Sequence, residues 1–165
     1  MKQLPTGVMA PDFELHTLGG EVFRLSEAVL GGPVVVAFYK VSCPTCQFTL
    51  PYLQRIYSEI GISSKVKIRG ISQDDALDTT GFSERFGISF DSLIDPHPYL
   101  TSSAYGIEYV PALFVVDSDM RIKLSDYGFS KAALSEVARI VAEGTRMGVP
   151  ELFSANDGVP ATRPG

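Results

Sequence analysis

The two cysteines of this chain, Cys43 and Cys46, are separated by two residues in the stretch "FYKVSCPTCQFTLP". A pair at this spacing could supply half of a zinc site, close a small disulfide loop, or cycle between dithiol and disulfide. Zinc needs about four ligands, and the two histidines, His16 and His97, do not lie at ligand spacing from the cysteines. We therefore expect no metal and no other cofactor.

The residues around the pair predict a buried strand followed by a helix. The run "PVVVAFYK" is apolar and β-branched, which is typical of a strand buried on both faces. After the cysteines, apolar residues from Phe48 recur at helical spacing as far as Gly61. Cys43 is therefore expected at the helix N-terminus, where unpaired N–H groups and the helix dipole favour an anion. Pro44 suits the first helical position, because it has no N–H to leave unpaired.

This placement predicts different roles for the two sulfur atoms. A cysteine attacks only as its thiolate, and the helix N-terminus favours that form at Cys43. Cys46 lies three residues further on, within reach of Cys43 across the first turn but more enclosed. We expect Cys43 to attack a disulfide and Cys46 to resolve the mixed disulfide that results.

The remaining elements alternate in type along the chain. The patterns predict a hairpin at 13–25, a short helix with Ser26 as its N-cap, strands at 65–72 and 91–96, helices at 73–87 and 97–106, two strands at 112–128, and a helix at 130–144. Strands alternating with helices, followed by a hairpin and a closing helix, indicate an α/β fold. Its central mixed sheet should be flanked by helices on both faces.

Length and composition exclude several classes of protein. The chain has 165 residues and a net charge of -5, and it has no basic run that could neutralise nucleic-acid phosphates. No apolar stretch approaches the roughly 20 residues needed to span a bilayer. The sequence as given has no signal peptide, which predicts a cytoplasmic protein, or an exported one if a leader was trimmed. We expect one domain over residues 1–148 and a loosely packed C-terminal extension, rich in Pro and Gly, over 149–165.

Residues 8–148 resemble the thioredoxin-fold superfamily, specifically the TlpA/ResA-like thiol–disulfide oxidoreductases and the AhpC/TSA peroxiredoxins. The resemblance rests on "APDFELHTLGGEVFRL", "VVVAFYKVSCPTC", Pro51, "GISQDD" and "YGIEYVPALFVVD". It implies a thioredoxin-like fold with an N-terminal β-hairpin extension. It also implies a cis-proline at Pro111 that faces the cysteines and exposes the backbone of Val110 to an extended substrate.

The same resemblance implies a thiol–disulfide oxidoreductase that acts on protein or small-molecule disulfides and takes electrons from a reductase or a thioredoxin-type donor. Val110 and the residues flanking the cysteines, Ser42, Pro44 and Thr45, are the expected substrate contacts. Lys40 is the nearest cation and could stabilise the thiolate. The chain departs from its relatives in having no Trp before the first cysteine, and in carrying Ala37 and Thr49 where they have acidic residues.

Two other functions remain open. A peroxiredoxin-like antioxidant peroxidase would need the pattern P-x-x-x-T-x-x-C, but counting back from Cys43 places Lys40 at the Thr position and Val36 at the Pro position. Counting back from Cys46 fits no better, although Arg121 could supply the guanidinium that such enzymes use. A redox-inert binding module is the third possibility, and the two cysteines beside Pro111 argue against it.

Overall fold

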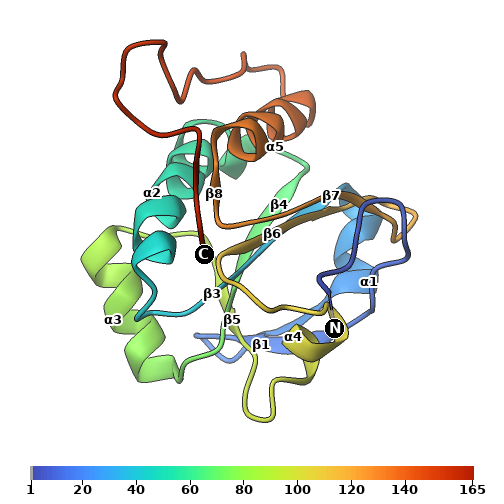
Figure 1. The fold of residues 1–165 in the computed structure, drawn as a ribbon. Helices are drawn as coiled ribbons and strands as arrows, with labels where there is room; N and C mark the ends of the chain where they lie inside the picture. The colour runs from blue at the N-terminus through green and yellow to red at the C-terminus, as the bar shows by residue number, and fades with distance from the viewer. Residues whose placement is uncertain (1) are drawn as a thin grey trace.

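The computed structural model describes residues 2–165, so that Met1, the first residue of the expected domain, lies outside the described residues. A seven-stranded sheet in the order β2-β1-β5-β4-β3-β6-β7 forms the centre of the molecule (Figure 1). Its strands are β1 (Glu14–Thr17), β2 (Val22–Arg24), β3 (Val34–Tyr39), β4 (Lys67–Ser72), β5 (Ser92–Ile94), β6 (Ala112–Val116) and β7 (Ile122–Tyr127). Two short strands, β8 (Phe129–Ser130) and β9 (Thr162–Arg163), form a second sheet.

The helices lie close to the predicted positions. They are α1 (Leu25–Ala28), α2 (Pro44–Glu59), α3 (Ala76–Phe86), α4 (Leu100–Ala104) and α5 (Lys131–Glu143), with short 3-10 helices at Val29–Gly31 and Gly61–Ser63. The helix α2 continues through Pro51. Among the described residues, no helix is long and apolar enough to cross a membrane.

The strand β3 lies inside the sheet because every one of its residues is apolar or aromatic and buried. It pairs in parallel with β4 on one side and antiparallel with β6 on the other. The sheet is therefore mixed, and the predicted α/β class is confirmed.

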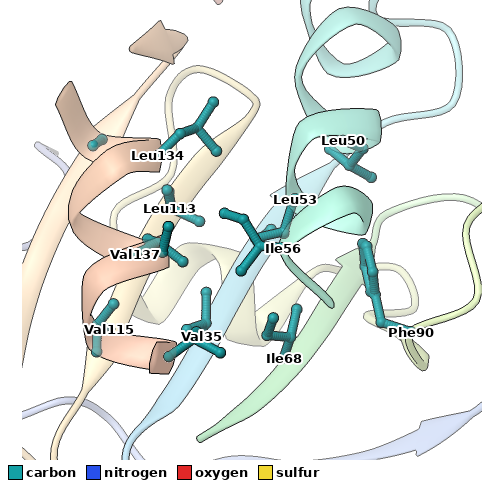
Figure 2. Packing of buried hydrophobic residues seen from close by; sticks show 14 of the residues in the cluster. Val35, Leu50, Leu53, Ile56, Ile68, Phe90, Leu113, Val115, Leu134 and Val137 are labelled. Carbon is teal, nitrogen blue, oxygen red and sulfur yellow. The ribbon is translucent and has the colours of Figure 1, made fainter. Parts of the chain in front are cut away.

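Alternate residues of β3 contribute to two separate hydrophobic cores, because successive side chains of a strand point to opposite faces. Val35 and Tyr39 belong to the core beneath α2 and α5, which Figure 2 shows packing against this face of the sheet. Val36 and Phe38 belong to the second core, together with α1 and the residues before β1. Helices cover both faces, as the sequence predicted.

Ser26 is not the N-cap of α1, so that prediction was wrong. The cap position is Arg24, and the Ser26 hydroxyl instead donates to Asp12 Oδ2 at 2.8 Å. The carboxylate of Asp12 also accepts from the Ser26 backbone N–H at 2.9 Å. A long-range acceptor has therefore replaced the local cap that the pattern suggested.

The segment 149–165 packs onto the domain more closely than its composition predicted. Leu152 is only 8% exposed, and the Phe153 ring lies 5.0 Å from that of Tyr52 on α2, measured between centroids. The guanidinium of Arg55 donates to the carbonyl of Glu151 at 3.0 Å. A Pro- and Gly-rich composition did not reveal these contacts, because they depend on α2.

One edge of the sheet gathers the chain segments that carry the chemistry. The parallel strands β3 and β4 end side by side, with Tyr39 opposite Ser72. The antiparallel strand β6 begins at the same edge, with Ala112 opposite Phe38, and β7 ends there with Tyr127 opposite Ala112. The loops that follow β3, precede β6 and follow β7 therefore lie next to one another.

Candidate functional site

Cys43 is the N-cap residue of α2, as the sequence predicted. Its backbone is extended, with φ of -83° and ψ of 115°, and its Sγ accepts a hydrogen bond from the Cys46 N–H at 3.2 Å. The sulfur therefore satisfies one of the N–H groups that a helix leaves unpaired at its start. The positive end of a helix of 16 residues also favours negative charge on this atom. Cys43 is partly exposed, so a disulfide can reach it.

Cys46 lies one helical turn away and is fully buried, at 0% exposure. Burial raises the pKa of the Cys46 thiol, and its hydrogen bond with Cys43 raises the pKa further. Both cysteines are free thiols in this structure. The geometry thus separates an accessible sulfur that can attack from an enclosed one that keeps its proton.

The bond between Val110 and Pro111 is cis, as the resemblance implied. Because β6 begins immediately afterwards, this bond lies beside the end of β3 and the loop that carries Cys43. The Cys43 thiol donates to the Val110 carbonyl oxygen at 3.5 Å. The structure therefore brings the predicted proline loop into contact with the predicted nucleophile.

The other predicted site residues differ in exposure. Ser42 and Pro44 are exposed beside Cys43, whereas Thr45 is buried. Lys40 is also exposed, and its backbone carbonyl accepts from the Cys43 N–H at 3.3 Å.

The sequence did not predict that Asp74 would form part of the site. Its Oδ2 accepts a hydrogen bond from the Val41 N–H at 2.8 Å, and the Gln47 side-chain amide donates to the Val41 carbonyl at 2.9 Å. Both polar groups of the Val41 backbone are therefore held. The loop between β3 and Cys43 is fixed at its centre by a carboxylate from the loop after β4.

A small cavity lies beneath the proline loop, with a volume of about 10 Å³. Ala37 and Thr49, which stand where relatives carry acidic residues, both line it beside Pro111. Asp126 of β7 lines it too, and sequence reasoning missed this carboxylate because it comes from a distant strand. The two positions at which the resemblance implies acidic residues thus carry Ala37 and Thr49, and Asp126 of β7 lines the same cavity.

The last residues of the chain also reach the site, which the sequence did not predict. The Thr45 hydroxyl donates to the Pro164 carbonyl at 2.7 Å, and Thr45 is only 8% exposed.

The structure places Arg121, which a peroxidase would need beside the nucleophile, away from the proline loop. Arg121 precedes Ile122, which pairs with Val116 at the far end of β6 from Pro111. Its guanidinium donates to the Gly7 carbonyl at 3.0 Å. Within the described part of the chain, no cluster of three or more His, Cys, Asp or Glu residues could hold a metal ion.

Comparisons with known proteins agree with this geometry. A family model described as the AhpC/TSA family matches residues 6–125. The thiol–disulfide oxidoreductase ResA of Geobacillus thermodenitrificans is 31% identical over 118 residues, which are 71% of this chain and 66% of that protein. The matched part thus spans just under two thirds of this relative's length.

Solved structures share the fold. The thioredoxin domain of a thiol–disulfide oxidoreductase from Bacteroides vulgatus superimposes with a TM-score of 0.73 at 23% identity, covering 84% of this chain and 99% of that one. The peroxidoxin BcpB of Mycobacterium tuberculosis superimposes with a TM-score of 0.65, also at 23% identity, covering 83% and 94%. The fold is therefore thioredoxin-like, and it does not by itself separate exchange of disulfides from reduction of peroxides.

Proposed function

Because this chain belongs to the AhpC/TSA family, we propose that it is a thiol–disulfide oxidoreductase in which Cys43 and Cys46 cycle between dithiol and disulfide. One observation carries the proposal: a partly exposed sulfur at the start of α2 receives an N–H hydrogen bond from its buried partner cysteine. This arrangement stabilises a thiolate that can attack and keeps a second thiol one turn away.

The reaction proceeds in two exchanges. The Cys43 thiolate attacks one sulfur of the substrate disulfide, the substrate S–S bond breaks, and its other sulfur leaves as a thiolate. Cys46 then loses its proton and attacks Cys43 Sγ, which releases the second substrate thiolate and forms the Cys43–Cys46 disulfide. Two electrons pass to the substrate, whose thiolates take up the protons that the cysteines released. A dithiol donor regenerates the enzyme by the reverse exchange.

Val110, Ser42, Pro44 and Thr45 are the proposed substrate contacts. An extended polypeptide could pair with the backbone at Val110, while Ser42 and Pro44 present exposed surface beside the sulfur. Lys40, also exposed, is proposed to stabilise the thiolate.

Protein or small-molecule disulfides are the proposed substrates, and a reductase or thioredoxin-type protein is the proposed electron donor. Residues 1–148 are proposed as the catalytic domain and 149–165 as its extension. The cytoplasmic location stays a prediction, which fractionation of cells producing the protein would check.

Two serine variants test the chemistry. Cys43→Ser should abolish reduction of insulin, because no nucleophile remains at the partly exposed position. Cys46→Ser should accumulate a mixed disulfide through Cys43, because attack survives and resolution does not. Mass spectrometry of the alkylated reaction mixture measures this adduct. Normal turnover by Cys46→Ser would refute the resolving role, and turnover by Cys43→Ser would refute the proposal itself.

A further inference from the structure

Residues 161–165, here called segment 161–165, lie across the site, and two of them, Thr162 and Arg163, form the added strand β9. Within this segment β9 pairs antiparallel with β8, with Arg163 opposite Phe129 and Thr162 opposite Ser130. The Lys131 backbone N–H donates to the Ala161 carbonyl at 2.9 Å. Figure 1 shows this end of the chain, in red, running beside α2 and β8.

The same segment contacts both loops of the site. On one side, the Thr45 hydroxyl, between the two cysteines, donates to the Pro164 carbonyl at 2.7 Å. On the other side, Gly165 lies so close to the proline loop that an added Cβ would meet the Val110 carbonyl oxygen at 2.5 Å. An extended backbone therefore already occupies the space between Thr45 and Val110.

The Arg163 side chain of the segment has a defined binding position on the ring of Phe48. The Arg163 guanidinium lies over the Phe48 ring, 4.4 Å from its centroid, where the electron-rich face of the ring attracts a cation. The Phe48 ring in turn packs edge-on against Phe129 of β8, with centroids 4.9 Å apart. The aromatic platform and the strand edge thus form one continuous surface.

Gly128 allows the backbones to approach this closely. Its φ is +72°, and an added Cβ would lie 2.4 Å from the Arg163 carbonyl oxygen. A side chain here would be strained by its own backbone and would collide with the segment. The surface is therefore shaped to receive a polypeptide backbone.

The sequence of the segment prepares it for this pairing. Pro160 and Pro164 restrict Val159 and Arg163 to extended conformations. Arg163, the second residue of β9, therefore has less backbone freedom to lose when the strand pairs.

We propose that the surface formed by β8, Gly128, Thr45, Phe48 and Val110 is the docking surface for polypeptide disulfides, and that segment 161–165 occupies it as a built-in competitor. The inference rests on the proposed function. An extended substrate would use the same groups: the Lys131 N–H, the Thr45 hydroxyl and the Phe48 ring. A polypeptide must therefore displace the segment before Cys43 reduces its disulfide to two thiols, whereas a small disulfide reaches the partly exposed Cys43 directly.

Segment 161–165 should bind the docking surface strongly enough for its effect on the rate to be measured, and weakly enough for a polypeptide to displace it. Two strands of two residues each make a pairing that is marginal in isolation. Its tether to the domain nevertheless gives the segment an effective concentration on the order of millimolar. Weakening the segment should raise the apparent affinity for polypeptides in proportion to the fraction of molecules in which the docking surface is open.

Arg163→Ala tests the proposal, and Arg146→Ala is its matched control, because Arg146 is exposed on the loop after α5. Both variants lose one positive charge. The readout is the ratio of the rate for insulin to the rate for 2-hydroxyethyl disulfide, a small neutral substrate. Arg163→Ala should raise this ratio at least about threefold, and Arg146→Ala should leave it at the wild-type value. A ratio in Arg163→Ala that matches the control, or falls below it, overturns the proposal.

A second measurement does not depend on turnover. Hydrogen exchange of the Lys131 amide should be faster in Arg163→Ala than in the wild type, because the Ala161 carbonyl no longer holds it. A synthetic peptide with the sequence of residues 159–165, at concentrations on the order of millimolar, should slow that exchange again. Equal exchange in both proteins would overturn the proposal. If the wild type reduces neither disulfide, the proposed function fails, and amide exchange still decides whether the segment holds this surface.

Discussion

Thr49 shows at the scale of one residue how this site differs from those of its relatives. Its hydroxyl is buried and has no hydrogen-bond partner among the described residues. Thr49→Val keeps the shape of the side chain and removes the unpaired polar group, so it should raise the free energy of unfolding by about 1 kcal/mol. Urea denaturation measures the change.

Thr79→Val is the matched control for this prediction. Thr79 is also helical and fully buried, but its hydroxyl shares a 2.7 Å hydrogen bond with Ser72. That variant should lose roughly 1–2 kcal/mol of stability, because the buried Ser72 hydroxyl loses its hydrogen bond with Thr79. If Thr49→Val is less stable than the wild type, the hydroxyl has a partner in solution. If Thr49→Val also resolves mixed disulfides more slowly, the Thr49 hydroxyl and its partner contribute to the resolving step.

Reduction of peroxide is the second prediction at this scale. A peroxidase needs donors placed where charge develops on the leaving oxygen. Lys40 stands in the position of the required threonine, and Arg121 lies beyond the far end of β6. The reduced protein should consume hydrogen peroxide no faster than an ordinary exposed thiol, while it exchanges with insulin at least about tenfold faster than free dithiol does.

Stopped-flow measurements of both reactions on one preparation give the comparison, with Cys43→Ser as the control. Fast consumption of peroxide that disappears in Cys43→Ser would make the protein a peroxidase and reverse the ranking of the two activities.

The sequence predicted the residues of the site whose positions are set locally or by the family pattern. Cys43 and Cys46 follow from a strand, a turn and a helix in succession, and Pro111 follows from the resemblance. Asp74 and Asp126 could not be found in this way, because each reaches the site from a different strand or loop. Their positions depend on the order of strands in the sheet, which no local pattern encodes.

At the scale of elements, the contact between two loops should control the reactivity of the site. Asp74→Ala removes the acceptor of the Val41 N–H and loosens the turn before Cys43. We expect the insulin rate to fall by about tenfold, which corresponds to about 1.4 kcal/mol. Asp74→Asn retains an oxygen acceptor and should recover most of the rate.

Asp75→Ala supplies the control for this experiment. Asp75 caps α3 by accepting from the Asp78 N–H at 2.8 Å, so its loss should cost about 1 kcal/mol of stability. It has no part in holding Val41, and the insulin rate should stay at the wild-type value. Equal rates in Asp74→Ala and Asp75→Ala would show that the Asp74 contact only stabilises the fold.

The elements themselves were largely predictable because their patterns are long or strongly apolar. The fully buried β3 and the apolar stripe of α5 are examples. Two details of short elements were not predicted correctly: α1 begins without Ser26 as its cap, and β9, which has only two residues, was not predicted. A strand of two residues carries no alternation of apolar side chains, and only its partner β8 makes it visible.

At the scale of the whole molecule, the buried thiol links folding to pH. Burial raises the pKa of the Cys46 thiol above that of the unfolded chain, about 8.5. Below that pH both states keep the proton, and above it only the folded state does. The free energy of unfolding of the dithiol protein should therefore fall as pH rises beyond about 8.5, by up to about 1.4 kcal/mol per unit.

Burial likewise raises the pKa of Tyr39 to about 12, so above pH ~10 this group adds to the loss. Denaturation at pH 8, 9 and 10 under reducing conditions tests the contribution of the thiol. The variant Cys46→Ala should show a shallower decline between about pH 9 and 10 than the wild type. Equal slopes in the two proteins would mean that Cys46 titrates alike in both states.

The hydrogen bond from Thr45 to Pro164 has a thermodynamic consequence, because Thr45 lies inside the loop that the Cys43–Cys46 disulfide would close. Two equilibria that share one residue obey reciprocity. If oxidation of the cysteines changes the equilibrium constant for binding of segment 161–165 by some factor, binding of the segment changes the equilibrium constant between dithiol and disulfide by the same factor. A tenfold factor corresponds to about 30 mV in the reduction potential. Equilibration of the wild type, Arg163→Ala and Arg146→Ala with glutathione would measure the reduction potential of each protein. The difference between Arg163→Ala and the other two gives the coupling between segment 161–165 and the disulfide.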